Sequence, residues 1–206
     1  MRRWIWTLVI LAVLAAAYWT WPFVGAAGLA SAAQRGDSAA VIERVDLPAL
    51  RRSLARQIAL AYLEATGKGG KLGSIGRNLM GAAATTVADP YVAELLTPEN
   101  ITALIGRGKI GTVKLGDKDV AVNRDLPGFA SLLHGDWLSM LTGSYFDGLT
   151  SFVIPAETRG AAADNYAVHL RLDGLTWRLS GIDLPASMVD QIARSILAQN
   201  GGTSTP

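Results

Sequence analysis

An uncharged N-terminal run constrains this chain more than any other feature of its sequence. Residues 4–21 follow Arg2 and Arg3, and their only polar members are two threonines and one tyrosine. As an α-helix this run would span about 27 Å, close to the roughly 30 Å hydrocarbon core of a bilayer. A helix packed in a soluble core normally keeps one polar face, and this run has none. Residues 1–22 are therefore predicted to enter a membrane.

Aromatic residues mark both ends of the apolar run. Trp4 and Trp6 lie at its start, and Tyr18, Trp19 and Trp21 lie at its end. Tryptophan and tyrosine prefer the two interfaces of a bilayer, so these five side chains are predicted membrane-interface contacts. Basic residues stay on the cytoplasmic side, and the pair before the run therefore directs the rest of the chain across the membrane.

A cleaved signal peptide is the alternative to an uncleaved anchor. Ile5 to Leu14 would then be the hydrophobic region, and Ala15-Ala16-Ala17 would supply the small residues of a cleavage site. Cleavage near Ala17 would release the remainder from the membrane. The sequence leaves both alternatives open.

The remainder predicts one globular domain over residues 23–199, followed by a disordered polar tail over 200–206. Pro22 is expected to break the first helix, with a second helix from Phe23 to Gln34. Asp37 or Ser38 can cap a short helix through Arg44, and Asp46 can cap a longer one that carries Pro48 in its first turn. Thr97-Pro98 has the same form. The apolar stripe of the longer helix consists of Leu47, Leu50, Leu54, Ile58, Ala61 and Tyr62.

The C-terminal part has the composition of strands. Tyr145–Ile154, Asn165–Leu172 and Thr176–Leu184 are rich in β-branched and aromatic residues, and a weaker strand is indicated within 110–115. Asp173-Gly174 favours a tight hairpin between the last two strands. An amphipathic helix, Ala186–Gln199, follows. Helices followed by consecutive strands predict an α+β domain, with several helices packed on an antiparallel sheet of about three to four strands.

The residues that usually carry catalysis or metal binding do not form a recognisable pattern. Cysteine is absent, and the two histidines, His134 and His169, lie far apart in the sequence. Neither Ser144 nor Ser180 occurs in a nucleophile motif, and the glycine-rich loop over 67–73 is not a phosphate-binding motif. The net charge of +2 is too small to indicate nucleic-acid binding. We therefore expect a protein that is not an enzyme, with no catalytic, cofactor-binding or metal-binding residues and no cofactor.

One cluster of charge has a possible function beside a membrane. Basic side chains gather between residues 51 and 77 and can contact anionic headgroups, or they can form an ordinary solvated face. These residues are Arg51, Arg52, Arg56, Lys68, Lys71 and Arg77.

Several short motifs resemble the DUF2939 family of uncharacterised bacterial proteins. The clearest is Val45-Asp46-Leu47-Pro48-Ala49-Leu50-Arg51-Arg52-Ser53-Leu54. The others are Tyr18-Trp19, Pro22-Phe23, Ala32-Ala33, Gly36-Asp37, Ala88-Asp89-Pro90, Leu96-Thr97-Pro98-Glu99, Trp177-Arg178-Leu179 and Ile182-Asp183-Leu184-Pro185. The resemblance implies a proteobacterial envelope protein and supplies no activity. More loosely, the order of elements looks like a cone-shaped, NTF2-like fold.

Together these features predict a single-pass inner-membrane protein, with its N-terminus in the cytoplasm and its domain in the periplasm. Secretion to the periplasm after cleavage near Ala17 is the alternative. The domain is expected to act by binding or as a structural partner of the membrane, of another envelope protein or of a lipid. The rival function is the binding of a lipid or small hydrophobic ligand in an NTF2-like pocket.

Overall fold

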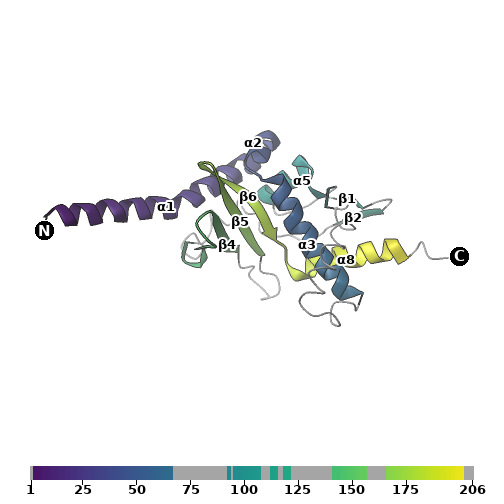
Figure 1. The fold of residues 1–206 in the computed structure, drawn as a ribbon. Helices are drawn as coiled ribbons and strands as arrows, with labels where there is room; N and C mark the ends of the chain where they lie inside the picture. The colour runs from purple at the N-terminus through teal and green to yellow at the C-terminus, as the bar shows by residue number, and fades with distance from the viewer. Residues whose placement is uncertain are drawn as a thin grey trace.

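A long helix projects from one side of an α+β domain (Figure 1). The computed structural model describes residues 2–66, 92–93, 95–107, 112–115, 118–121, 141–156 and 166–201. Helices come first in the chain, and an open four-stranded antiparallel sheet and a last helix follow. The predicted α+β class is confirmed.

Helix α1 (Arg2–Gln34) is continuous through Pro22, so the predicted break there is wrong. Proline has no N–H, which leaves the carbonyl of Tyr18 without its helical partner. The helix nevertheless continues because the residues after Pro22 pack into the domain, where Ala26 and Leu29 are fully buried. Tertiary packing thus outweighs the lost hydrogen bond.

The next helices begin at the predicted capping residues. Asp37 Oδ1 accepts a 3.0 Å hydrogen bond from the Ala40 amide at the start of α2 (Ser38–Glu43). Asp46 Oδ1 accepts one of 3.0 Å from the Ala49 amide at the start of α3 (Leu47–Ala65). Such caps satisfy amides that have no partner within the helix.

The buried face of α3 and the start of α5 (Pro98–Arg107) also agree with the predictions made from the sequence. Leu50, Leu54, Ile58 and Ala61 of the predicted stripe are buried in α3. At α5, the Asn100 amide donates to Thr97 Oγ1 over 3.2 Å. The sequence also favours a helix over 74–87, and these residues lie outside the described ones.

The main sheet contains four antiparallel strands that neighbour one another in chain order. They are β3 (Tyr145–Phe146), β4 (Ser151–Ala156), β5 (Tyr166–Asp173) and β6 (Thr176–Asp183). The prediction of one strand over Tyr145–Ile154 is wrong, because residues 147–150 turn the chain between β3 and β4. Gly148 has a φ of +89° in this turn, a conformation that glycine adopts without steric cost.

The predicted hairpin between β5 and β6 is confirmed. Asp173 pairs with Thr176, and Gly174 between them has a φ of +62°. A separate ribbon joins β1 (Thr112–Leu115) to β2 (Lys118–Ala121), so the weak strand has a partner that the sequence did not indicate. Helix α8 (Ala186–Gly201) ends the described chain and includes the first residues of the predicted tail.

The chain before α3 and α3 itself cover the edge of β6. The Leu179 amide donates to the Arg44 carbonyl over 2.9 Å, and the Asp46 amide donates to the Leu179 carbonyl over 2.7 Å. Gln57 of α3 then donates to the Ile182 carbonyl over 2.8 Å and accepts from the Leu184 amide over 2.9 Å. These bonds pair backbone groups that an open edge would leave exposed.

The core lies between the sheet and the helices and is filled. The cavity there measures about 20 Å³, room for little more than one water molecule. Its lining comes from α1, α5 and the strands β5 and β6: Leu29, Leu104, Ile105, Tyr166, Val168, Leu179 and Ile182. Among the described residues this space is too small to hold a lipid.

Candidate functional site

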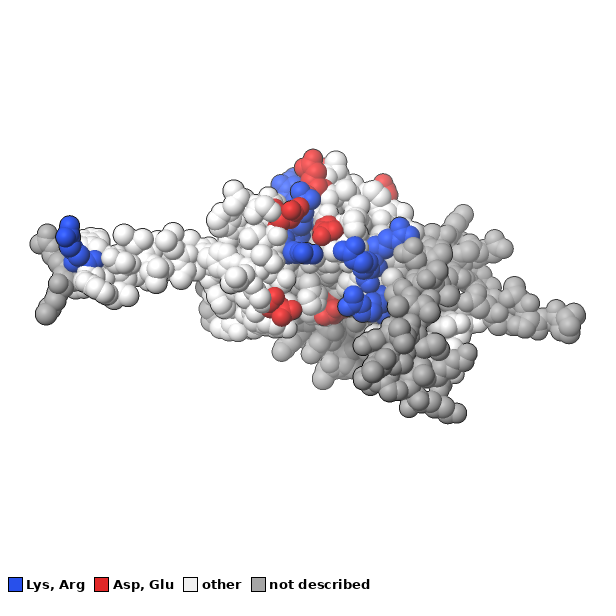
Figure 2. All heavy atoms as spheres, in the orientation of Figure 1, with Lys and Arg blue, Asp and Glu red and all other residues white. Residues whose placement is uncertain are grey.

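The first half of α1 is an exposed apolar rod, which the described part of the domain contacts only at the last residues of the rod. Residues 3–21 are all exposed, and the large apolar side chains among them include Leu8, Leu11 and Leu14 at 61 to 64 % exposure. In the space-filling view the rod is white, apart from blue side chains at its free end (Figure 2). Among the described residues, this is the one helix long and apolar enough to cross a membrane. A signal sequence has the same properties.

The two threonine hydroxyls within the rod are satisfied by its own backbone. Thr7 Oγ1 donates to the Arg3 carbonyl over 3.1 Å, and Thr20 Oγ1 donates to the Ala16 carbonyl over 3.1 Å. A hydroxyl that finds its acceptor one turn back needs no water, and this is what a hydrocarbon environment requires. The rod is therefore suited to lipid along its whole length.

The five aromatic residues predicted at the membrane interface lie at the two ends of this rod. Trp4 and Trp6 are 79 % and 62 % exposed, whereas Tyr18, Trp19 and Trp21 lie between 37 % and 44 %. The second group is less exposed because two of its members also contact the domain. These residues therefore form the junction between rod and sheet.

At this junction, rings from α1 stack on rings from the sheet. Tyr18 stacks on Phe146 with centroids 5.1 Å apart, and Trp19 meets the same ring edge-on at 5.3 Å. Phe23 packs edge-on against Phe152 at 5.2 Å. Aromatic pairs at these separations add about 0.5–1.5 kcal/mol each beyond the area they bury. The rod is thus held to the domain by several side chains rather than by a flexible link.

A close backbone approach and one hydrogen bond complete the junction. A Cβ atom on Gly25 would lie 2.8 Å from the Cβ of Trp177, so only glycine allows α1 to pack this closely on β6. The Tyr18 hydroxyl donates to the Leu149 carbonyl in the turn between β3 and β4. Phe146, Phe152 and Trp177 lie within the predicted strands, and their aromatic side chains are the sequence signal for this junction.

The predicted basic contacts are described in part. Arg51, Arg52 and Arg56 are exposed on α3, whereas Lys68, Lys71 and Arg77 lie outside the described residues. Figure 2 shows basic side chains gathered over α3, well away from the rod. Contact between these arginines and a membrane stays a prediction.

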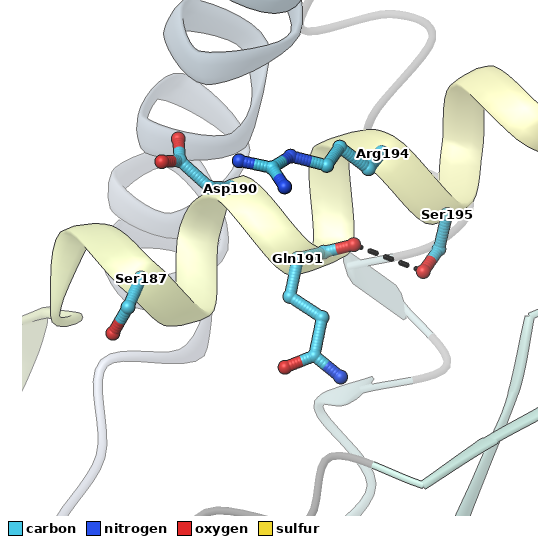
Figure 3. Close-up of a pocket in the computed structure, with 5 residues that line it drawn as sticks. All are labelled: Ser187, Asp190, Gln191, Arg194 and Ser195. Carbon is cyan, nitrogen blue, oxygen red and sulfur yellow. Dashed lines mark hydrogen bonds between the residues drawn. The ribbon is translucent and has the colours of Figure 1, made fainter.

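A polar depression of about 620 Å³ lies along α8, at the end of the molecule far from the free end of α1 (Figures 1 and 3). Its described lining is Ser187, Asp190, Gln191, Arg194 and Ser195. Arg194 extends toward Asp190 along one helical turn, and Ser195 Oγ donates to the Gln191 carbonyl over 2.9 Å (Figure 3). A serine bonded to its own helix in this way is not presented as a nucleophile.

His169 lies on the sheet face opposite the buried Val168 and Leu170. Its Nε2 is 2.7 Å from Asp183 Oδ2 on the neighbouring strand. The hydrogen bond with Asp183 raises the pKa of His169; burial opposes this, and the charges of Asp183 and Asp147 add to the rise. The other histidine, His134, lies outside the described residues.

The His169–Asp183 pair does not resemble a hydrolase site. Ser180 Oγ donates to the backbone carbonyl of His169 over 3.2 Å instead of bonding to its ring. In the part of the chain that the structure describes, no three His, Asp or Glu side chains are grouped as metal ligands. The pair is arranged as a cross-strand contact of the β5–β6 hairpin.

Asp183→Asn should lower the pKa of His169, because it removes the hydrogen bond and the charge that raise it. In the wild type, the folded pKa lies above the unfolded value of about 6.5, so the stability from this pair is full below that pH. It is lost as the pH rises through the folded pKa. An NMR titration of the imidazole in both proteins measures the effect. An unchanged His169 pKa in the variant would contradict the pairing.

Comparison with known proteins agrees with the resemblance seen in the sequence. The family model described as "Protein of unknown function (DUF2939)" matches residues 11–104, from the apolar rod to α5. This range includes the motif over Val45–Leu54, whereas the motifs in β6 lie beyond it. No curated protein and no solved structure matches the chain. The predicted resemblance is confirmed, because residues 11–104 match the model of the DUF2939 family.

Proposed function

We propose that this chain is a membrane-tethered envelope domain, in which residues 4–21 cross the bilayer and the α+β domain acts on the far side by binding or as a structural partner. The observation that carries the proposal is the apolar rod, which is exposed over residues 3–21. Burying a leucine or isoleucine is worth about 1.5–3 kcal/mol. Seven leucine, isoleucine or valine side chains and four tryptophans left in water would cost an amount comparable to the whole stability of a domain, about 5–15 kcal/mol. The rod therefore needs an apolar surrounding, and a bilayer matches its length.

The orientation of the chain in the membrane follows from the basic residues at its N-terminus. Arg2 and Arg3 precede the rod, and basic residues are retained on the cytoplasmic side. With the N-terminus inside, the domain faces the periplasm of a bacterial inner membrane. Its filled core favours an interaction surface over an internal ligand pocket.

The same geometry accommodates cleavage near Ala17. Contacts between α1 and the sheet begin at Tyr18, one residue after the alanines, so the cleaved product would keep the whole junction. The two alternatives therefore share the junction and differ in whether the residues before Tyr18, and with them the attachment to the membrane, are retained.

Native membranes distinguish the alternatives. We expect the intact mass of the full chain in the membrane pellet, and we expect alkaline carbonate to leave it there because residues 4–21 are embedded in hydrocarbon. A peripheral protein of the same cells, released by carbonate, is the control. A soluble product that begins near Tyr18 would contradict the anchor and would establish secretion instead.

A further inference from the structure

The end of the sheet nearest α1 displays apolar side chains to solvent. Leu149 is 83 % exposed and Leu175 is 77 % exposed. They lie in the β3–β4 and β5–β6 turns, which fall at the same end of the sheet because its strands are antiparallel and follow chain order. The Leu172 amide donates to the Thr150 carbonyl over 2.8 Å and ties the two turns together. The domain thus presents two exposed leucines at one end of the sheet.

Both turns lie beside the aromatic end of the rod. The Tyr18 hydroxyl donates to the carbonyl of Leu149 itself. Trp177 packs against Gly25 of α1, and Leu175 lies two residues, about 7 Å, nearer the turn. Figure 1 shows the β5–β6 turn alongside α1, directed toward its free half. The two leucines therefore lie near the level of Tyr18 and Trp21 along the helix axis.

If the rod spans a bilayer, the position of Leu149 and Leu175 along the axis of α1 determines their depth in the lipid. Tyr18 precedes Trp21 by three residues, about 4.5 Å of helix, so it lies within the interfacial zone on the domain side. We propose that the β3–β4 and β5–β6 turns contact the lipid interface through Leu149 and Leu175, which clamps the domain against the bilayer in one orientation. This inference rests on the proposed membrane anchor.

The charged residues around the two turns indicate which kind of lipid this surface can contact. Two acidic residues, Asp147 and Asp173, and two basic residues, Arg171 and Arg178, lie near the turns, so their charges cancel. Arg178 forms an ion pair with Asp173 over 3.2 Å. Such a surface does not select anionic headgroups. The leucines instead bury apolar area, which depends little on lipid charge. Contact through the arginines of α3 would require anionic lipid.

Single cysteines can test this contact, since the natural chain has none. Full-length Leu149→Cys and Leu175→Cys are labelled with a thiol fluorophore and reconstituted in phosphatidylcholine vesicles whose acyl chains carry a bromine quencher. Leu11→Cys in the rod is the embedded control. Leu60→Cys on α3, where Leu60 is 39 % exposed, is the aqueous control.

We expect quenching at positions 149 and 175 between the levels of the two controls, and no change when phosphatidylglycerol is added. Labels at 149 and 175 that match position 60, with position 11 quenched, would overturn the lipid contact and leave the anchor standing. Quenching that appears only with phosphatidylglycerol would also overturn it. Absence of quenching at position 11 would instead overturn the proposed anchor and, with it, this inference.

Discussion

Leu54→Asp should abolish the folded domain. Leu54 is 4 % exposed and lies in the core cluster that joins α3 to the sheet. A carboxyl group placed there has no partner, and burying an unpaired polar or charged group costs several kcal/mol. That cost approaches the whole stability of a domain, about 5–15 kcal/mol. Urea unfolding in detergent, followed by circular dichroism, measures the loss.

Leu60→Asp is the matched control for this substitution. Leu60 lies on the same helix and is 39 % exposed, so its carboxylate remains hydrated. We expect its unfolding midpoint to stay close to that of the wild type. A Leu54→Asp protein with the wild-type midpoint would contradict the packing of α3 described above.

Trp177→Ala should destabilise the domain by about 3–5 kcal/mol, the usual cost of removing a large buried aromatic side chain. Trp177 is 2 % exposed, and its ring lies 6.0 Å from Phe146 and 6.3 Å from Phe152. The cavity would open where α1 meets the sheet, so the loss should also loosen the rod from the domain. The same unfolding experiment measures it.

Leu175→Ala is the control, two residues away in the same hairpin. Its side chain is 77 % exposed, and we expect a change within about 0.5 kcal/mol. Equal midpoints for Trp177→Ala and the wild type would show that the junction contributes nothing to stability.

Local chemistry made much of this fold predictable. Asp37, Asp46 and Thr97 accept hydrogen bonds from the first turns of their helices, as their sequence positions indicated. The hairpin at Gly174 needed a positive φ, and the sequence supplied glycine there. Each of these features depends on a few neighbouring residues, which is why a single sequence reveals it.

Other features of the fold were predicted wrongly or not at all. Pro22 was expected to end a helix, but burial of residues beyond it, which the sequence cannot show, keeps α1 continuous. The apolar residues on both sides of Asp147-Gly148 resemble one long strand and hide the turn, although that dipeptide is a turn signal. The junction joins Tyr18 to Phe146 and was not predictable, since no local pattern links positions so far apart.

The central claim is that α1 carries the domain across a membrane. Two fusions to the C-terminus of the full chain test it most directly: a phosphatase that is active only outside the cytoplasm, and a fluorescent protein that matures only within it. The structure ends in α8, away from the rod, so a fusion there leaves the anchor intact. We predict an active phosphatase and a dark fluorescent protein. A fluorescent fusion with an inactive phosphatase would contradict the claim.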